Sequence, residues 1–205
     1  MNSTELLNNK LDKSFYFQSV TDVARNLLGK YIVKFENSEI LAGKIVETEA
    51  YDNKFDEASH SFKGKTKRNE VMFDEGGKLY IYFTYGMYFC ANVVTGGKDY
   101  GSAVLIRAAE PLQGIDKMFK RRFPDKAFSE KDKTKICSCP GKLCIAFALN
   151  KGNNGTDLCG NNIFISEGEY IEPSIIKSGK RIGIKKSQDL NWRYYIENNP
   201  YISVK

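Results

Sequence analysis

Apolar and polar positions in the first half of the chain alternate in short runs that predict strands. YIVKF at residues 31–35 and ILAGKIVETEAY at residues 40–51 combine β-branched residues with near alternation, as half-buried strands do. KLYIYFTYGMYFCANVVT at residues 78–95 is rich in aromatic residues and is interrupted by Gly86, which predicts a β-hairpin. GSAVLIRAAEP at residues 101–111 predicts a further strand.

Helical spacing of apolar residues predicts short helices between these strands. The predicted ranges are 21–30, 113–123 and 140–150. Thr21 is expected to cap the first helix, and Pro140 stands in the first turn of the last. Residues 52–77 form a long polar connection, and a loop of that length inside a domain is usually functional.

The order of these elements predicts an α+β fold in a single domain. We expect a curved antiparallel or mixed sheet, flanked by helices, from which the hairpin protrudes. Residues 1–13 are polar and are expected to form a loose N-terminal arm, and residues 14–205 are expected to form the domain. A chain of 205 residues is long enough to bury a substantial core.

Composition and charge narrow the classes of function. The 31 Lys and Arg residues exceed the 25 Asp and Glu residues, and a net charge of +6 favours a polyanionic partner only weakly. The polar start MNSTELLNNKLDKSF does not resemble a signal peptide, and no apolar run reaches membrane-spanning length, so a cytoplasmic protein that binds no membrane is expected. The five cysteines are expected to be reduced thiols. The spacing of Cys137, Cys139 and Cys144 lacks zinc-type C-x2-C pairs, so these cysteines are not expected to hold a metal.

An acidic and aromatic segment, IVETEAYDNKFDEASHS at residues 45–61, is the first candidate for chemistry. In a strand, Ile45, Glu47, Glu49 and Tyr51 share one face, because side chains alternate. One interpretation is a solvent-facing strand edge. The other is a cleft in which a carboxylate beside aromatic walls acts as a general base. The loop carboxylates that follow, Asp52, Asp56 and Glu57, are expected to be ordinary surface charges.

The tyrosines of the predicted hairpin are the second candidate. Tyr80 and Tyr82 share one face, while Tyr85 and Tyr88 bracket the turn at Gly86. A tyrosine at a hairpin tip can wedge between stacked bases, and base–aromatic stacking contributes about 1–3 kcal/mol per base. The alternative is that these rings belong to the core, as most aromatic residues in strands do.

Several ordered motifs resemble one known family. They are ETEAY at 47–51, the histidine nine residues later, YxxYGMYFCxN at 82–92, LxRAxEP at 105–111, SCPGKLCIAFALNK at 138–151, RIGI at 181–184 and NPYISV at 199–204. This series is similar to the alkyladenine DNA glycosylases, the 3-methyladenine DNA glycosylases of the mammalian type. The resemblance implies an enzyme that flips alkylated or deaminated purines out of duplex DNA and hydrolyses the N-glycosidic bond, without a lyase step or a cofactor.

The resemblance also implies a role for individual residues. Glu49 corresponds to the general base that activates water, and Arg107 to the arginine that helps to hold that water. Tyr51, His60, Tyr82 and Asn92 correspond to the base pocket, Tyr85 to the intercalating residue, and Lys65, Thr66, Tyr88, Lys142 and Lys151 to contacts with the DNA backbone. Glu47 is expected to be structural.

Two other classes of function remain open at this point. A non-catalytic protein that binds damaged DNA would keep the wedge and the pocket, although it would need neither Glu49 nor Arg107. A sugar hydrolase with Glu47 and Glu49 as a carboxylate pair is disfavoured by the basic charge and the tyrosine-rich hairpin. The partner that the resemblance implies is double-stranded DNA that contains damaged purines, and the protein is expected to act as a monomer.

Overall fold

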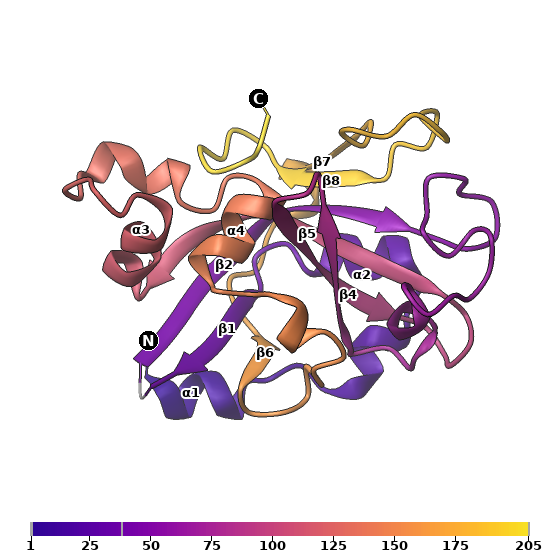
Figure 1. The fold of residues 1–205 in the computed structure, drawn as a ribbon, viewed down its shortest axis with the longest axis horizontal. Helices are drawn as coiled ribbons and strands as arrows, with labels where there is room; N and C mark the ends of the chain where they lie inside the picture. The colour runs from indigo at the N-terminus through magenta and orange to yellow at the C-terminus, as the bar shows by residue number, and fades with distance from the viewer. Residues whose placement is uncertain (1, 38, 205) are drawn as a thin grey trace.

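A single antiparallel sheet organises the chain, in a computed structural model that describes residues 2–37 and 39–204 (Figure 1). Its strands are β1 (Tyr31–Glu36), β2 (Glu39–Tyr51), β3 (Leu79–Thr84), β4 (Tyr88–Thr95), β5 (Ser102–Gln113), β6 (Ile163–Ser166), β7 (Ile176–Gly179) and β8 (Arg193–Ile196). The order in the sheet is β3-β4-β5-β2-β1-β6, and β8 pairs with both β2 and β7. The predicted α+β single domain is confirmed, and each strand pair is antiparallel.

Strand β2 is the longest strand and connects the parts of the sheet. Its first half pairs with β1, residues 47–49 pair with β8, and β5 runs along most of its length. The β2–β5 register shifts around Glu47: one extra residue, Val46, lies on β2 and another, Arg107, lies on β5. Such bulges bend strands and redirect side chains.

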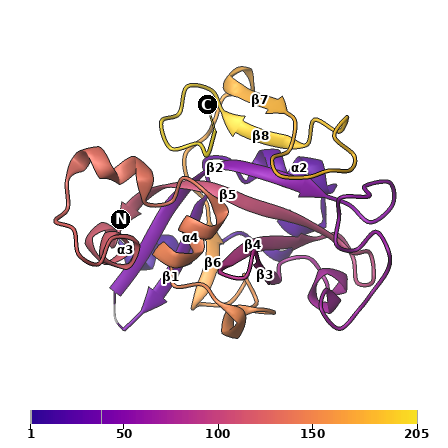
Figure 2. The same cartoon turned by 45° about the horizontal axis from the view of Figure 1, so that its top comes forward.

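Helices flank the sheet. They are α1 (Ser3–Asn8), α2 (Val20–Asn26), α3 (Ile115–Arg122) and α4 (Pro140–Ala146), with short 3-10 helices at Lys13–Phe17, Glu70–Phe73, Glu130–Lys135, Lys151–Asn153 and Pro173–Ile175. α2 packs against β2 and β5, where the Thr48 hydroxyl donates to the Ala24 carbonyl, and α4 packs against β4 and β5. The two views show these helices around the central strands (Figures 1 and 2). The expected cap at Thr21 was wrong, because the Ser19 hydroxyl accepts the Asp22 amide instead.

The N-terminal segment differs from the expected loose arm. Residues 3–8 form α1, capped by the Asn2 side chain, and Leu6 packs with Val33, Ala42 and Phe164 against the sheet. The polar composition of the segment concealed this contact, because Leu6 is the buried residue of the helix and the residues around it are polar. Residues 1 and 205, the outer limits of the two predicted ranges, lie outside the described residues.

The predicted hairpin is formed by β3 and β4, with Thr84 opposite Tyr88 and residues 85–87 at its tip. Tyr85 has a φ of 51° and Gly86 a φ of 67°, so the turn depends on two consecutive left-handed residues. Tyr85 is 80% exposed at this tip, unlike the aromatic residues that fill the core. In the described part of the chain, no helix is long and apolar enough to span a membrane.

Candidate active site

A row of side chains crosses four neighbouring strands on one face of the sheet. Glu49 on β2 lies opposite Leu105 on β5, Leu105 lies opposite Asn92 on β4, and Asn92 lies opposite Tyr80 on β3. Residues directly opposed in an antiparallel sheet point to the same face. The pairing register therefore brings together residues from the three separate motifs ETEAY, YxxYGMYFCxN and LxRAxEP.

A cavity of about 620 Å³ opens above this row, within the range of sites that enclose a small organic molecule. Two groups of lining residues differ in character. We call the inner group the walls, and it consists of Tyr51, Ala58, His60, Met72, Tyr80, Tyr82, Cys90, Asn92, Ala103 and Leu105. We call the outer group the mouth, and it consists of Thr84, Tyr85, Tyr88, Arg122, residues 139–142 and residues 183–186. The walls are mainly aromatic and apolar, whereas four cations lie at the mouth: Arg122, Lys142, Lys185 and Lys186.

Glu49 is fully buried beside the inner end of this cavity. Its carboxylate accepts the Tyr51 hydroxyl at 2.8 Å and the Ile182 amide at 2.7 Å, and it pairs with Arg107 Nη1 at 3.2 Å. Burial raises the pKa of Glu49, and the attraction of Arg107 and the Ile182 hydrogen bond oppose this effect without cancelling it. A raised pKa makes the ionised carboxylate a better proton acceptor.

Tyr51 keeps its proton and so remains a donor to Glu49. Burial and the neighbouring Glu49 charge both raise the pKa of Tyr51 well above its usual value. The phenol therefore orients the carboxylate while its ring lines the cavity. The sequence placed these two residues on one strand face, and the hydrogen bond between them confirms that placement.

Arg107 reaches Glu49 because it is the extra residue of the bulge on β5. Its guanidinium also donates from Nε to Glu47 Oε1 at 3.3 Å and from Nη2 to the Ser203 hydroxyl at 3.2 Å. Glu47 in turn accepts Arg193 Nε at 2.6 Å and the Ser203 amide at 2.6 Å. This buried carboxylate thus fixes Arg107 and the C-terminal segment, in agreement with the structural role expected for it. We call Glu47, Glu49, Arg107 and Ile182 the floor.

His60, Tyr80 and Tyr82 form one aromatic wall. The His60 and Tyr82 rings meet edge to face with centroids 4.5 Å apart, and His60 Nδ1 lies 3.1 Å from the Tyr80 hydroxyl. Burial and then the positive charge of Arg68 lower the pKa of His60, so the imidazole stays neutral at pH 7. Sequence reasoning missed Tyr80 as a wall residue, although its shared face with Tyr82 was a signal that could have identified it.

Asn92 is buried between this wall and Glu49 in the cross-strand row. Its side-chain amide donates to the Tyr80 carbonyl at 3.0 Å and lines the cavity. The predicted pocket residues Tyr51, His60, Tyr82 and Asn92 therefore line one cavity next to Glu49.

The predicted DNA-contact residues divide into two groups. Tyr85, Tyr88 and Lys142 lie at the mouth, where the Tyr88 ring packs so close to Gly141 that a Cβ there would lie 3.0 Å from it. Lys65, Thr66 and Lys151 do not line the cavity. Lys65 lies near Asp99, and the Thr66 hydroxyl and amide both donate to the Asn69 side chain.

The mouth also contains cations that the sequence did not single out as functional. Lys185 and Lys186 follow directly after RIGI, and Arg122 ends α3. Their adjacency to a family motif was the only signal in the sequence for the two lysines. Within residues 2–37 and 39–204, no group of three or more His, Cys, Asp or Glu side chains is arranged to hold a metal ion.

Comparisons with a family model and with individual proteins both point to one family. A family model described as methylpurine-DNA glycosylase matches residues 14–200. A protein of Carboxydothermus hydrogenoformans named "Putative 3-methyladenine DNA glycosylase" is 45% identical over 95% of this chain and 99% of its own length. Proteins with the same name from Clostridium novyi and Alkaliphilus oremlandii are 44% and 42% identical, each over 96% of this chain.

Proposed function

Because the chain belongs to the methylpurine-DNA glycosylase family, we propose that it hydrolyses the N-glycosidic bond of damaged purines in duplex DNA with Glu49 as the general base. The proposed substrates are 3-methyladenine, 7-methylguanine, hypoxanthine and ethenoadenine nucleotides. The observation that carries this proposal is the position of Glu49, which is held by three donors beside a cavity with aromatic walls.

Flipping the nucleotide out of the helix is the first step of the proposed reaction. A purine would enter the cavity and stack on the rings of Tyr51, His60 and Tyr82. Alkylation makes a purine positively charged, and a cationic ring is attracted to the electron-rich face of a tyrosine. Asn92 would clash with the amino group of normal guanine, and a normal pair also costs more to open.

The chemical step needs a base close to the sugar. As the bond from C1′ to the purine nitrogen breaks, its electron pair leaves with the purine, and the sugar gains oxocarbenium character. Ionised Glu49 stabilises this positive charge and takes a proton from the attacking water, whose oxygen bonds to C1′. A cationic alkylpurine leaves as a neutral base, so it requires no acid, whereas a neutral purine such as hypoxanthine carries the electron pair away as a negative charge and must gain a proton as it leaves. Arg107, 3.2 Å from Glu49, would help to hold the water.

We assign the intercalating role to Tyr85, and its exposure on a strained hairpin tip at the edge of the cavity supports this assignment. In this proposal it fills the gap that the flipped nucleotide leaves. We propose that the reaction is monofunctional: the lysines that line the cavity, Lys142, Lys185 and Lys186, lie at its mouth, and none belongs to the walls, where a Schiff base with the sugar could form. We further propose that the protein acts as a monomer.

The test is a glycosylase assay on duplexes that each contain one hypoxanthine, ethenoadenine or 7-methylguanine. Abasic sites, revealed by strand cleavage in alkali, are expected with the wild type. Borohydride should trap no covalent complex, since no lysine attacks the sugar. Binding to the lesion duplexes without any base release would instead support a damaged-DNA binding protein, and would contradict the proposed reaction.

A further inference from the structure

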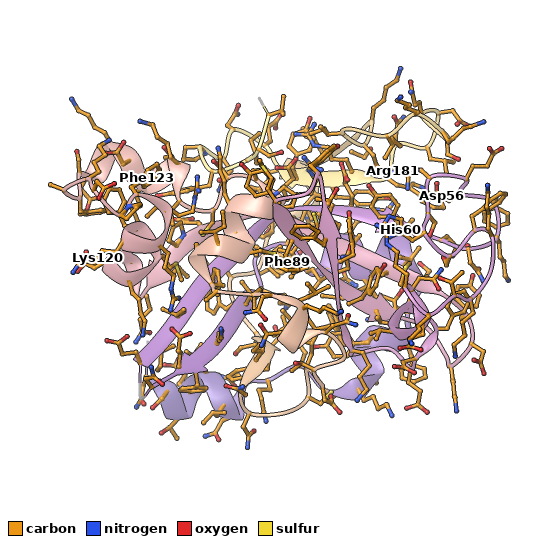
Figure 3. All side chains as sticks on the ribbon, in the orientation of Figure 1. Asp56, His60, Phe89, Lys120, Phe123 and Arg181 are labelled. Atoms are coloured by element: carbon orange, nitrogen blue, oxygen red, sulfur yellow. The ribbon has the colours of Figure 1, made fainter. Side chains whose placement is uncertain are left out.

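Arg181 and Asp56 form a fully buried ion pair outside the floor. Arg181 donates from Nη1 to Asp56 Oδ2 at 2.5 Å and from Nη2 to Asp56 Oδ1 at 2.7 Å, and both side chains are 0% exposed. Figure 3 shows the two residues side by side; Asp56 comes from the loop after β2, and Arg181 comes from the segment between β7 and β8. The expectation that Asp56 is an ordinary surface charge was therefore wrong, because a residue 125 positions away covers it.

The arginine side of this pair supports Tyr51. The Arg181 guanidinium lies 4.6 Å from the centre of the Tyr51 ring and donates to the carbonyl of Ala50 at 2.8 Å. Tyr51 lines the cavity and Arg181 does not, so the guanidinium lies behind the ring and sets its plane. A bidentate arginine is well suited to this task, since its planar fork is held in one orientation.

The aspartate side organises the loop that leads to His60. Asp56 Oδ1 accepts the amide of Ala58, a wall residue, at 3.0 Å, and the Asp56 carbonyl accepts the Ser59 amide at 2.9 Å. The loop has no helix or strand between Tyr51 and Glu70. Its shape therefore depends on such side-chain contacts, and Asp56 is fixed by Arg181.

The residue after Arg181 completes the connection. Ile182 donates its amide to Glu49 Oε1 at 2.7 Å, so the placement of Arg181 determines where this donor lies. One ion pair thus connects the Tyr51 ring, the loop before His60 and a donor to Glu49. Burial of two charges usually costs about as much as their attraction returns, so net stability alone gives a weak reason for such a pair.

We propose that Arg181 and Asp56 are positioning residues, which set the plane of Tyr51 and the Ile182 donor to Glu49 so that a bound purine and the general base meet in the reactive geometry. This inference rests on the proposed function of Glu49. The main effect of the pair falls on the chemical step. Mouth residues 183–186 follow Arg181 directly, and Arg181 Nη2 donates to the Ser187 carbonyl at 3.3 Å, so a smaller effect on DNA binding is expected as well.

The test uses Arg181→Lys, which keeps the charge but loses the bidentate contact and the planar stack, and Asp56→Asn, which keeps the shape of the acceptor. Single-turnover base release from a hypoxanthine duplex is expected to fall about 10- to 100-fold in each, the effect of a displacement near 1 Å in a site. The Kd for the same duplex should change by a smaller factor than this rate. Glu57→Gln is the control, because Glu57 forms an exposed ion pair between the same two segments.

The pH profile separates positioning from simple loss of structure. The Ile182 amide lowers the pKa of Glu49, so a displaced amide should raise that pKa further. The acidic limb of the rate profile should therefore move to higher pH in Arg181→Lys, and stay in place in Glu57→Gln. Besides Arg181, the titratable or charged side chains that face Glu49 from the elements around it are Glu47, Tyr51, Tyr82, Cys90, Arg107 and Arg193.

The possible outcomes are distinct. Lower rates with an unmoved acidic limb and a lower melting temperature would mark the pair as structural only, and would overturn the inference. Wild-type rates in folded Arg181→Lys and Asp56→Asn would also overturn it, while base release by the wild type and its loss in Glu49→Gln would leave the proposed function intact. A wild type that releases no base would contradict both.

Discussion

The floor and the mouth of the cavity are built in opposite ways. At the floor, Glu47 and Glu49 are fully buried and each accepts several donors from strands and from the C-terminal segment. At the mouth, Tyr85 is 80% exposed at a tip with two left-handed residues, and Met87 beside it is 64% exposed. Glu47 and Glu49 lie on β2, and Tyr85 and Met87 lie at the tip of the β3–β4 hairpin of the same sheet. The two carboxylates are held by several donors, whereas the two side chains at the tip are mostly exposed.

This difference indicates that the floor and the mouth serve different steps of the proposed reaction. Chemistry requires groups that are held in place before the substrate arrives, because reorganisation during the reaction raises the barrier. Insertion into DNA requires a side chain that is exposed and free of protein partners. We therefore expect floor substitutions to alter the chemical step and mouth substitutions to alter the engagement of DNA.

The largest effect is expected from Glu49→Gln. Glutamine keeps the size of the side chain but cannot accept a proton, so single-turnover base release should fall by about 10²- to 10⁴-fold. Release is measured by alkali cleavage of a labelled hypoxanthine duplex. Glu57→Gln, an exposed carboxylate on a nearby loop, is the matched control and should keep the wild-type rate. Full activity in Glu49→Gln would show that another group is the base.

A smaller effect is expected from Tyr85→Ala. Loss of a stacking ring costs about 1–3 kcal/mol, which corresponds to a loss of about 5- to 150-fold in affinity for the lesion duplex. The readout is the Kd from fluorescence anisotropy, together with the melting temperature, which should not change because the side chain is exposed. Tyr170, 77% exposed and absent from the cavity lining, provides the control Tyr170→Ala. Equal losses in the two variants would refute the wedge role.

The pH dependence of the wild type should reflect the raised pKa of Glu49. The base acts when ionised, so the rate should fall as pH decreases through that pKa, by about tenfold per pH unit below it. Because burial raises the pKa of Glu49, the midpoint of this decrease in rate should lie above pH 4.5, the usual pKa of a glutamate. Single-turnover rates between pH 4 and pH 8 measure it, after circular dichroism has shown that the fold persists. A midpoint below pH 4.5 would contradict the account of Glu49.

The smallest effect is expected from Lys142→Ala at the mouth. Removal of one phosphate contact should weaken binding about equally for damaged and undamaged duplexes, and should reduce the slope of log K against log salt by about 1. Titrations at several salt concentrations give this slope. A loss confined to the lesion duplex would instead place Lys142 in base recognition.

Features of the floor and the mouth that depend on neighbouring residues in the chain were predicted well from the sequence. Alternation along β2 placed Glu49 and Tyr51 on one face, and the aromatic run with Gly86 predicted the hairpin and its exposed tip. Each of these follows from contacts between residues close in the chain. The capping residue of α2 was misassigned by two positions, since serine and threonine are both good caps and stand close together.

Long-range features could not be predicted in the same way. The bulge that aims Arg107 at Glu49 depends on the pairing of β5 with β2, and simple alternation gives no indication of it. Asp56 looked like a loop charge because its partner, Arg181, lies near the other end of the chain. The orientation of Arg107 and the burial of Asp56 both depend on tertiary contacts, and no local pattern in the sequence predicts such contacts.

The division between floor and mouth is tested most directly by the Kd of Glu49→Gln for a duplex whose lesion carries a 2′-fluorine that blocks hydrolysis. The wild type and Tyr85→Ala are measured on the same duplex. The account predicts a Kd for Glu49→Gln within about threefold of the wild type, because the floor acts after the nucleotide has entered, and a clearly weaker Kd for Tyr85→Ala. A loss of affinity in Glu49→Gln as large as that in Tyr85→Ala would contradict it.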